Sequence, residues 1–115
     1  MAIFGKKVNS IENGYEDLLI DDETIESVHT LFKNQAVLTN MRVIFEERES
    51  LNEMSLSFIV SIPYSKINAI ALERKGFTST NRLIISTGAK EYKLMFNLIE
   101  DVLKFQKSLS TFIFT

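Results

Sequence analysis

Two groups of residues near the amino terminus are of types that take part in catalysis or metal binding. His29 is the only histidine, and Asp21, Asp22 and Glu23 are three consecutive carboxylates. A histidine transfers protons, but one histidine in a chain without cysteine excludes a His-rich or thiolate metal site. The carboxylates lack the glycine and the alternating oxygen ligands of a calcium loop. We interpret His29 as a structural or surface residue and the acidic run as a solvated segment, and we predict no catalytic residue, no metal and no cofactor.

Motifs and composition exclude several classes of protein. Neither a GxxxxGK[ST] nor a GxGxxG pattern occurs, so no nucleotide-binding loop is predicted. The 115 residues carry a net charge of −2, with 45% hydrophobic and 24% charged residues. These values indicate one globular domain without an overall attraction to nucleic acid. No apolar run approaches the ~18 residues of a membrane span, and the absence of cysteine fits the cytoplasm, which is the compartment we expect.

The first half of the sequence predicts a short helix followed by strands. Ser10 suits the cap of a helix over residues 9–20, and the alternation over residues 25–31 indicates a strand. Two apolar runs, 36–38 and 43–45, flank the turn Thr39–Arg42, in which Asn40 tolerates the left-handed conformation of tight turns. This pattern predicts a hairpin. The charged residues 46–53 are predicted to form a solvated loop.

Pro63 decides the interpretation of the apolar stretch SIPYSKINAIALER, residues 61–74. Proline cannot donate a ladder hydrogen bond, and it disfavours a helical conformation at Ile62. A strand over residues 56–62 therefore ends there, and a second strand over 67–74 follows a corner. A turn at Gly76–Asn81 then leads to a hairpin of residues 82–87 and 91–96.

The last segment changes to the spacing of an amphipathic helix. Leu98, Val102, Phe105 and Leu109 recur at three- and four-residue steps, and Asn97 is the expected N-cap. The whole chain is then a single domain (1–115), with a lead of residues 1–22, about seven short strands over 23–97 and a capping helix over 98–113. Such a row of strands tends to close into a barrel, because open edges invite aggregation.

The phenylalanines divide into two groups by their position in this pattern. Those expected in the core are Phe45, Phe58, Phe96 and Phe105, whereas Phe4, Phe32, Phe77 and Phe114 fall outside it. A small barrel cannot bury all of them, so we expect some to line a subunit interface, together with the terminal Ile3 and the carboxy-terminal TFIFT.

Several segments carry a family resemblance, namely AVLTNMRVIFEER, SIPYSKINAIALE, NRLIISTGAKEYKLMF and the helix from Leu98. Together they cover most of the chain from about Glu23 onward and resemble the bacterial pleckstrin-homology (PH) domains. The resemblance implies a mainly β fold, a PH-like barrel of two near-orthogonal antiparallel sheets capped by an α-helix. It also implies self-association into rings. Phosphoinositide binding is disfavoured, because the stretch HTLFKNQAVL offers only Lys33 where clustered basic residues are needed.

Two functional hypotheses follow from these patterns. The first is a non-enzymatic binding or scaffold module that forms a homo-oligomer and contacts a protein or peptide partner through a strand edge or a groove between subunits. Its candidate partner-binding residues, at the two corners of the strand pattern, are Thr39, Asn40, Arg42, Tyr64 and Lys66.

The alternative is a monomeric membrane-surface adaptor. Its candidate membrane contacts are Arg74, Lys75 and Phe77, a basic–aromatic group in the segment ERKGF. The competing interpretation of this segment is an ordinary turn whose phenylalanine folds back onto the sheet.

Overall fold

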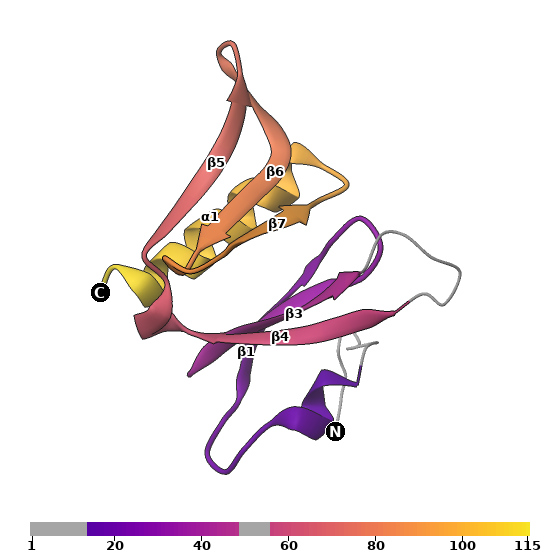
Figure 1. Cartoon of the computed structure of the whole chain (residues 1–115), viewed down its shortest axis with the longest axis vertical. Helices are drawn as coiled ribbons and strands as arrows, with labels where there is room; N and C mark the ends of the chain where they lie inside the picture. The colour runs from indigo at the N-terminus through magenta and orange to yellow at the C-terminus, as the bar shows by residue number, and fades with distance from the viewer. Residues whose placement is uncertain (1–13, 49–55) are drawn as a thin grey trace.

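The structure is a computed structural model that describes residues 14–48 and 56–115 (Figure 1). In chain order its elements are the 3-10 helix η1 (Tyr15–Leu18), strands β1 (Ile25–Thr30), β2 (Gln35–Thr39), β3 (Arg42–Arg48) and β4 (Ser57–Pro63), the 3-10 helix η2 (Tyr64–Lys66), strands β5 (Ala69–Lys75), β6 (Thr78–Ser86) and β7 (Glu91–Met95), and helix α1 (Ile99–Ile113). This order confirms the prediction of a mainly β fold that ends in a helix.

The strands form two antiparallel sheets. The first has the order β1-β2-β3-β4 and the second β5-β6-β7, so within each sheet every strand pairs with its neighbours in sequence. Strands of the two sheets run at a steep angle to one another (Figure 1). The predicted hairpins β2–β3 and β6–β7 are present. Pro63 ends β4, and η2 forms the corner to β5, as the sequence predicts.

Main-chain contacts join the two sheets at one corner. Leu31 bridges to Phe96 beyond the ends of β1 and β7, and the N–H of Phe32 donates to the carbonyl of Met95 at 2.8 Å. At the opposite corner η2 connects β4 to β5, and both are edge strands in the described part of the chain. The barrel is therefore sealed on the side of β1 and β7 and open on the side of β4 and β5.

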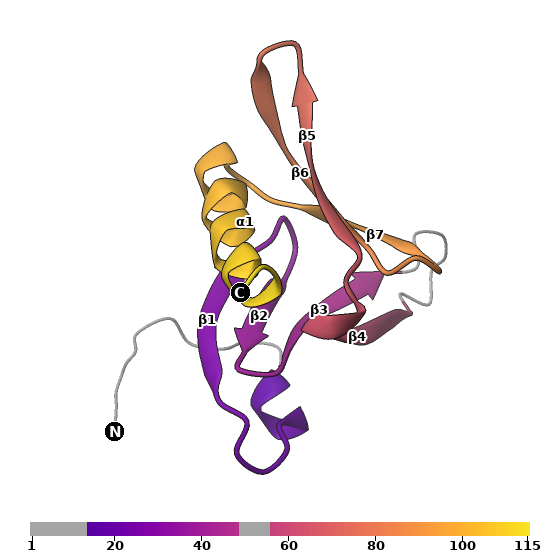
Figure 2. The ribbon, with the colours of Figure 1, turned by 90° about the vertical axis from the view of Figure 1, so that its left-hand side faces the viewer.

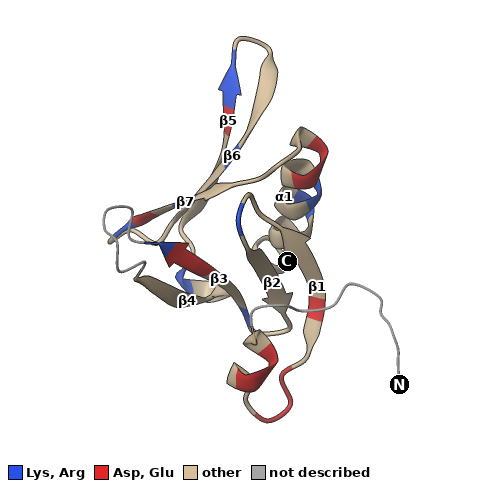
Figure 3. Cartoon of the chain, turned by 90° about the vertical axis from the view of Figure 1, so that its right-hand side faces the viewer, with Lys and Arg blue, Asp and Glu red and all other residues tan. Residues whose placement is uncertain are grey.

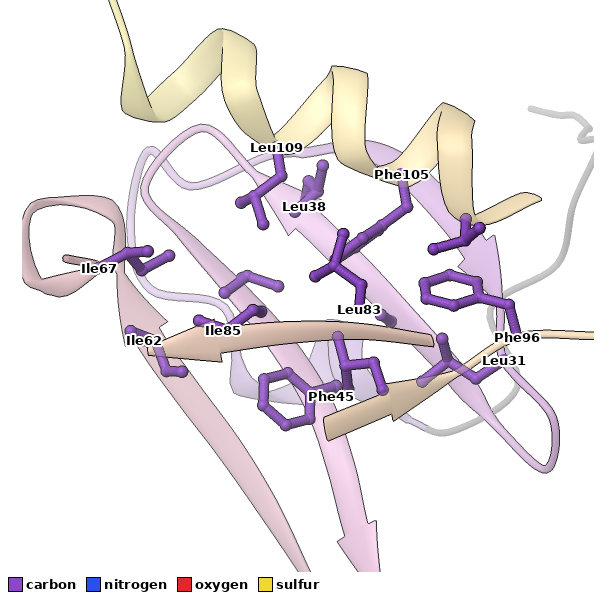
Figure 4. Packing of buried hydrophobic residues seen from close by; sticks show 14 residues of the cluster. Leu31, Leu38, Phe45, Ile62, Ile67, Leu83, Ile85, Phe96, Phe105 and Leu109 are labelled. Atoms are coloured by element: carbon purple, nitrogen blue, oxygen red, sulfur yellow. The ribbon is translucent and has the colours of Figure 1, made fainter. Parts of the chain in front are cut away.

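The hydrophobic core lies between the two sheets and beneath α1 (Figure 4). Phe45 from β3 and Leu83 from β6 point into it, and α1 adds Val102, Phe105 and Leu109, all completely buried. The Phe105 ring lies 5.3 Å from the ring of Phe96 and 5.1 Å from the ring of His29. Phe105 thus joins the helix to both sheets.

A second, smaller cluster covers the outer face of the first sheet. Tyr15 packs with Val37 and Ile44, and its hydroxyl donates to the carbonyl of Gln35 at 3.0 Å. Burial, with a further contribution from the charge of Glu46, raises the pKa of Tyr15 to about 12. The lead is therefore attached to the sheet by a neutral, hydrogen-bonded tyrosine.

The lead is less helical than the sequence predicts. The predicted helix over 9–20 is wrong for its described part, because η1 ends at Leu18 and Leu19 has an extended backbone. Residues 9–13, with the expected cap Ser10, lie outside the described residues. Burial of Tyr15 against the sheet, rather than a continuous apolar stripe, fixes this segment.

Strands β5 and β6 are longer than the sequence predicts. Strand β6 begins at Thr78, so Gly76 and Phe77 alone separate it from β5, whereas the sequence predicts a turn over Gly76–Asn81. Gly76 has a φ of 67°, which glycine adopts without steric cost. Residues 73–80 extend away from the barrel, and we call them the finger (Figure 2). Alternation did not reveal the start of β6 because Thr78–Asn81 are all polar.

Other local expectations are wrong for identifiable reasons. Phe58 is more than half exposed, because β4 continues past the region that the opposing sheet covers. Leu98, with no side-chain cap, takes the N-cap position of α1 in place of Asn97. Among the described non-glycine residues, Asp22 and not Asn40 has a left-handed backbone. Residues 46–48 continue β3 instead of forming a loop, and residues 49–53 lie outside the described part.

The position of Phe105 leads to a test of the core. Phe105→Ala should lower the free energy of unfolding by about 3–5 kcal/mol, because it removes a buried ring and leaves a cavity. Leu103→Ala, on the exposed side of the same helix, is the matched control and should cost less than about 1 kcal/mol. Urea unfolding followed by circular dichroism measures both changes. Equal losses for the two variants would contradict the assignment of Phe105 to the core.

Candidate functional site

Glu23 is the centre of a hydrogen-bond network at the turn between β2 and β3. Its side chain is fully buried, and it accepts hydrogen bonds from Arg42 Nε at 2.8 Å and Arg42 Nη2 at 2.9 Å. It also accepts from the hydroxyl of Thr39 at 2.7 Å and from the N–H of Ile20 at 3.1 Å. A buried carboxylate with this number of donors is stable in its charged form.

Arg42 connects this network to two further segments. Its Nη1 donates to the hydroxyl of Ser61 on β4 at 3.0 Å, and its Nη2 donates to the carbonyl of Leu18 at 2.9 Å. Hydrogen bonds from Arg42 hold the pKa of Glu23 down at about 2, and the bonds to Glu23 raise the pKa of Arg42. The pair therefore ties the lead, the β2–β3 turn and β4 together.

Most of the candidate partner-binding residues take part in this internal network. Thr39 is buried and accepts from the N–H groups of Met41 and Arg42, each at 2.9 Å. Asn40 pairs with residues 22–24 through its side chain and its N–H. The Tyr64 hydroxyl contacts the carbonyls of Thr39 and Arg42. Lys66 is exposed. Partner binding by these residues stays a prediction, but the structure gives four of them a role in folding.

The acidic run and His29, whose side chains could take part in catalysis or metal binding, have different partners in the structure. Glu23 turns inward to Arg42 while Asp21 and Asp22 are exposed, so the interpretation of the run as wholly solvated is wrong for Glu23. His29 packs its ring against Phe105 and shares a hydrogen bond with the Ser27 hydroxyl at 2.8 Å. Burial lowers the pKa of His29 to about 4, so that it is neutral near pH 7. Its surroundings are those of a structural residue.

Strand β4 exposes apolar side chains on both faces of an open sheet edge. Phe58, opposite Glu47, is 55% exposed, and Ile59, opposite Glu46, is 48% exposed. Leu56 precedes them and is also exposed. Within the described residues, β4 pairs with β3 alone, and its outer side makes no backbone hydrogen bond. Toward residues 14–48 and 56–115, this edge is an apolar surface whose outer main-chain donors and acceptors are unpaired.

Charge distinguishes β4 from the other three edge strands. Charged side chains are present on the others, namely Glu26 on β1, Glu73, Arg74 and Lys75 on β5, and Glu91 and Lys93 on β7. Strand β4, SFIVSIP, has none, and the sequence is uncharged throughout residues 54–65. Charged residues on an edge strand prevent unwanted pairing. Their absence leaves β4 as the edge most open to an added strand.

The candidate membrane-contact residues lie together at the tip of the finger. Phe77 is 96% exposed, so the expectation that its ring folds back onto the sheet is wrong. The guanidinium of Arg74 donates to the carbonyl of Phe77, and Lys75 is exposed beside it. The structure thus brings all three residues to one exposed tip.

Basic side chains from distant parts of the sequence line a shallow depression of about 190 Å³. The sequence patterns do not predict that they lie together. Lys33, Arg48 and Lys93 line it, together with Phe32 and Glu46. These residues come from three separate parts of the chain, and no local pattern could show that they meet. The carboxylate of Glu46 reduces the positive charge there, and the expectation against phosphoinositide binding stays a prediction.

Similarity to known proteins agrees with this geometry. A family model described as the bacterial PH domain matches residues 2–113. The chain belongs to the bacterial PH domain family. This confirms the resemblance inferred from the sequence. Among the described residues of this bacterial PH domain, no helix has the length and hydrophobicity needed to cross a membrane.

Other proteins are similar to this bacterial PH domain in sequence or in structure. The protein "Uncharacterized protein YozO" of Bacillus subtilis (strain 168) is 29% identical over 111 residues, which are 96% of each chain. The structure is similar to that of a pleckstrin homology domain from Shewanella amazonensis SB2B, with a TM-score of 0.71 and 18% identity over 88% of this chain and 93% of the other. A DUF1696 family protein with a pleckstrin-homology domain from Shewanella loihica PV-4 gives a TM-score of 0.64 and 19% identity over 86% of both chains. These structures confirm the PH-like fold.

The low pKa of Glu23 predicts how stability varies with pH. Because folding lowers this pKa from 4.5 to about 2, its stabilisation is complete above pH 4.5 and is lost as the pH falls toward 2. Glu23→Gln should reduce the free energy of unfolding at neutral pH by about 2 kcal/mol. It should also remove most of the dependence on pH in that window.

Urea unfolding of the two proteins at about pH 7, 4.5 and 3 measures this difference. Glu16→Gln, a change of an exposed carboxylate in the same lead, is the control and should behave as the wild type does. A Glu23→Gln variant that keeps the full acid sensitivity of the wild type would contradict the proposed role of the pair.

Proposed function

We propose that this PH domain is a non-enzymatic binding and scaffold module of the cytoplasm. It accepts an extended segment of a protein partner on the outer edge of β4, and it assembles with copies of itself so that several such edges are presented together. The observation that carries the proposal is the uncharged and exposed edge of β4.

The edge of β4 has the properties that strand addition requires. Main-chain pairing supplies affinity that depends little on sequence, and side chains on alternating faces supply selectivity. A strand added to β4 would place side chains against Phe58 on one face and against Ile59 on the other. An apolar, unprotected edge is a liability in a protein that lacks a partner. Its presence beside three charged edges supports a binding role.

The Arg42 contact with Ser61 supports a preformed binding edge. Arg42 fixes β4 to the network around Glu23, and Ile62 anchors the same strand in the core. A strand held in this way loses little conformational freedom when a partner segment is added. Binding should therefore leave the barrel unchanged and protect the amides on the outer side of β4.

A displayed library of random peptides tests this function with a defined probe. Selection on the full-length protein should enrich peptides with alternating apolar residues, and their synthetic forms should slow amide exchange in β4. Ile59→Lys should weaken their binding at least about tenfold, because it places a charge on the edge. Lysine at this position faces Glu46 across the β3–β4 pair, so the fold should be retained.

Leu103→Lys is the matched control, since it adds the same charge at an exposed apolar position on α1. It should bind the selected peptides as the wild type does. The proposal is wrong if Ile59→Lys also binds them unchanged, or if protection from exchange appears away from β4.

A further inference from the structure

Two serines on the outer face of β4 use their hydroxyl groups in different ways. Ser57 donates its proton to the carboxylate of Glu46 on β3. Ser61, further along the same face, accepts a hydrogen bond from Arg42 Nη1 at 3.0 Å. Because that bond uses a lone pair, the proton of the Ser61 hydroxyl remains available for donation. Within residues 14–48 and 56–115 this proton has no acceptor, and Ser61 is exposed.

The guanidinium of Arg42 makes Ser61 a stronger donor. A hydroxyl that accepts a hydrogen bond from a cation is polarised, and its own proton then forms a stronger bond. Four of the five N–H groups of Arg42 bond to Glu23, Ser61 and the carbonyl of Leu18. The fifth is on Nη1, the nitrogen that contacts Ser61, and it has no partner in the described part of the chain. Two donor groups are therefore gathered at one position of the open edge.

The charges around Ser61 select against an ionised side chain of the partner. The charge of Arg42 is matched by the buried carboxylate of Glu23 at 2.8 Å, so a second carboxylate gains little from it. The lead, which contacts Arg42, carries the exposed carboxylates of Glu16, Asp17, Asp21 and Asp22 (Figure 3). They repel an added carboxylate, whereas a lysine opposite Ser61 would place its ammonium beside the guanidinium. A neutral acceptor avoids both repulsions.

We propose that the partner segment carries an asparagine or glutamine opposite Ser61. The inference rests on the strand addition at β4 proposed above and names the residue that this edge selects. The side-chain carbonyl of the amide accepts from the Ser61 hydroxyl and from the remaining N–H of Arg42. Directly opposed residues of neighbouring strands have Cβ atoms about 4.5–5.5 Å apart, which is within reach of such a bond.

Apolar neighbours make this polar contact selective. Val60 adjoins Ser61 on the inner face, and Ile59 lies two residues from it on the outer face. The partner segment therefore needs an apolar residue next to the amide and another two residues away from it. An added strand displaces water from the edge, so a residue without an acceptor leaves the Ser61 donor unpaired. Such an unpaired donor lowers the affinity for the wrong segment.

Peptides selected on the wild-type protein, followed by a double-mutant cycle, test this proposal. The displayed library should enrich asparagine or glutamine at one position of the segment that protects β4 from amide exchange. In a synthetic peptide, replacement of this amide by alanine should weaken binding to the wild type about five- to tenfold. The same replacement should weaken binding to Ser61→Ala by less than about threefold, because the hydroxyl donor is absent there.

Ser57→Ala is the matched control. It removes a hydroxyl from the same face of the same strand, but one whose proton is already bonded to Glu46. The peptide amide should keep its full effect on this variant, and also on Ser61→Thr, which retains the hydroxyl. Thermal unfolding of each variant verifies that it is folded.

Three results would overturn the inference, and they differ in what they leave standing. Peptides that protect β4 but carry aspartate, glutamate, lysine or no preferred residue at this position refute the neutral acceptor and leave strand addition intact. An effect of the amide that is equal on the wild type and on Ser61→Ala refutes its contact with Ser61. Selected peptides that do not protect β4 refute strand addition itself, and the inference with it.

Discussion

The bidentate pair between Glu23 and Arg42 is the interaction that positions both the lead and the open edge of β4. It fixes the lead through Ile20 and Leu18, and it fixes β4 through Ser61. Because the Glu23 side chain is fully buried, loss of its partner leaves a charge without compensation, which is costly in a protein interior. One ion pair therefore positions both the segment around Leu18 and Ile20 and the strand whose outer edge is open.

The surfaces available for binding lie where secondary structure extends past the core. The inner part of β4 is anchored by Ile62, whereas Phe58, on the same face, projects beyond the opposing sheet. Likewise β6 is buried at Leu83 and Ile85 but solvated along the finger. The core stabilises each strand at one end, and the other end is free to meet a partner without a loss of packing. This division reconciles a tightly packed small barrel with the exposure of several large apolar side chains.

The sequence predicts most of the fold because β2, β3, β4 and α1 each bury a regular pattern, as Leu38, Phe45 and Phe105 illustrate. It does not predict the burial of Glu23, whose partner Arg42 is 19 residues away. Alternation indicates the face on which Phe58 lies but not how far the opposing sheet extends. The sequence indicates Thr39 and Arg42 at a turn and Tyr64 at a separate corner as candidate binding residues. Their shared hydrogen bonds, which a linear pattern cannot show, give them an internal role.

Molar mass in solution, measured by light scattering across a size-exclusion peak of the unmodified chain, tests the scaffold account most directly. The account predicts a single mass that is a multiple of the 13.2 kDa protomer and that decreases on dilution or in high salt. A mass of 13.2 kDa at every concentration would contradict it, and would leave a monomeric module whose open β4 edge binds alone.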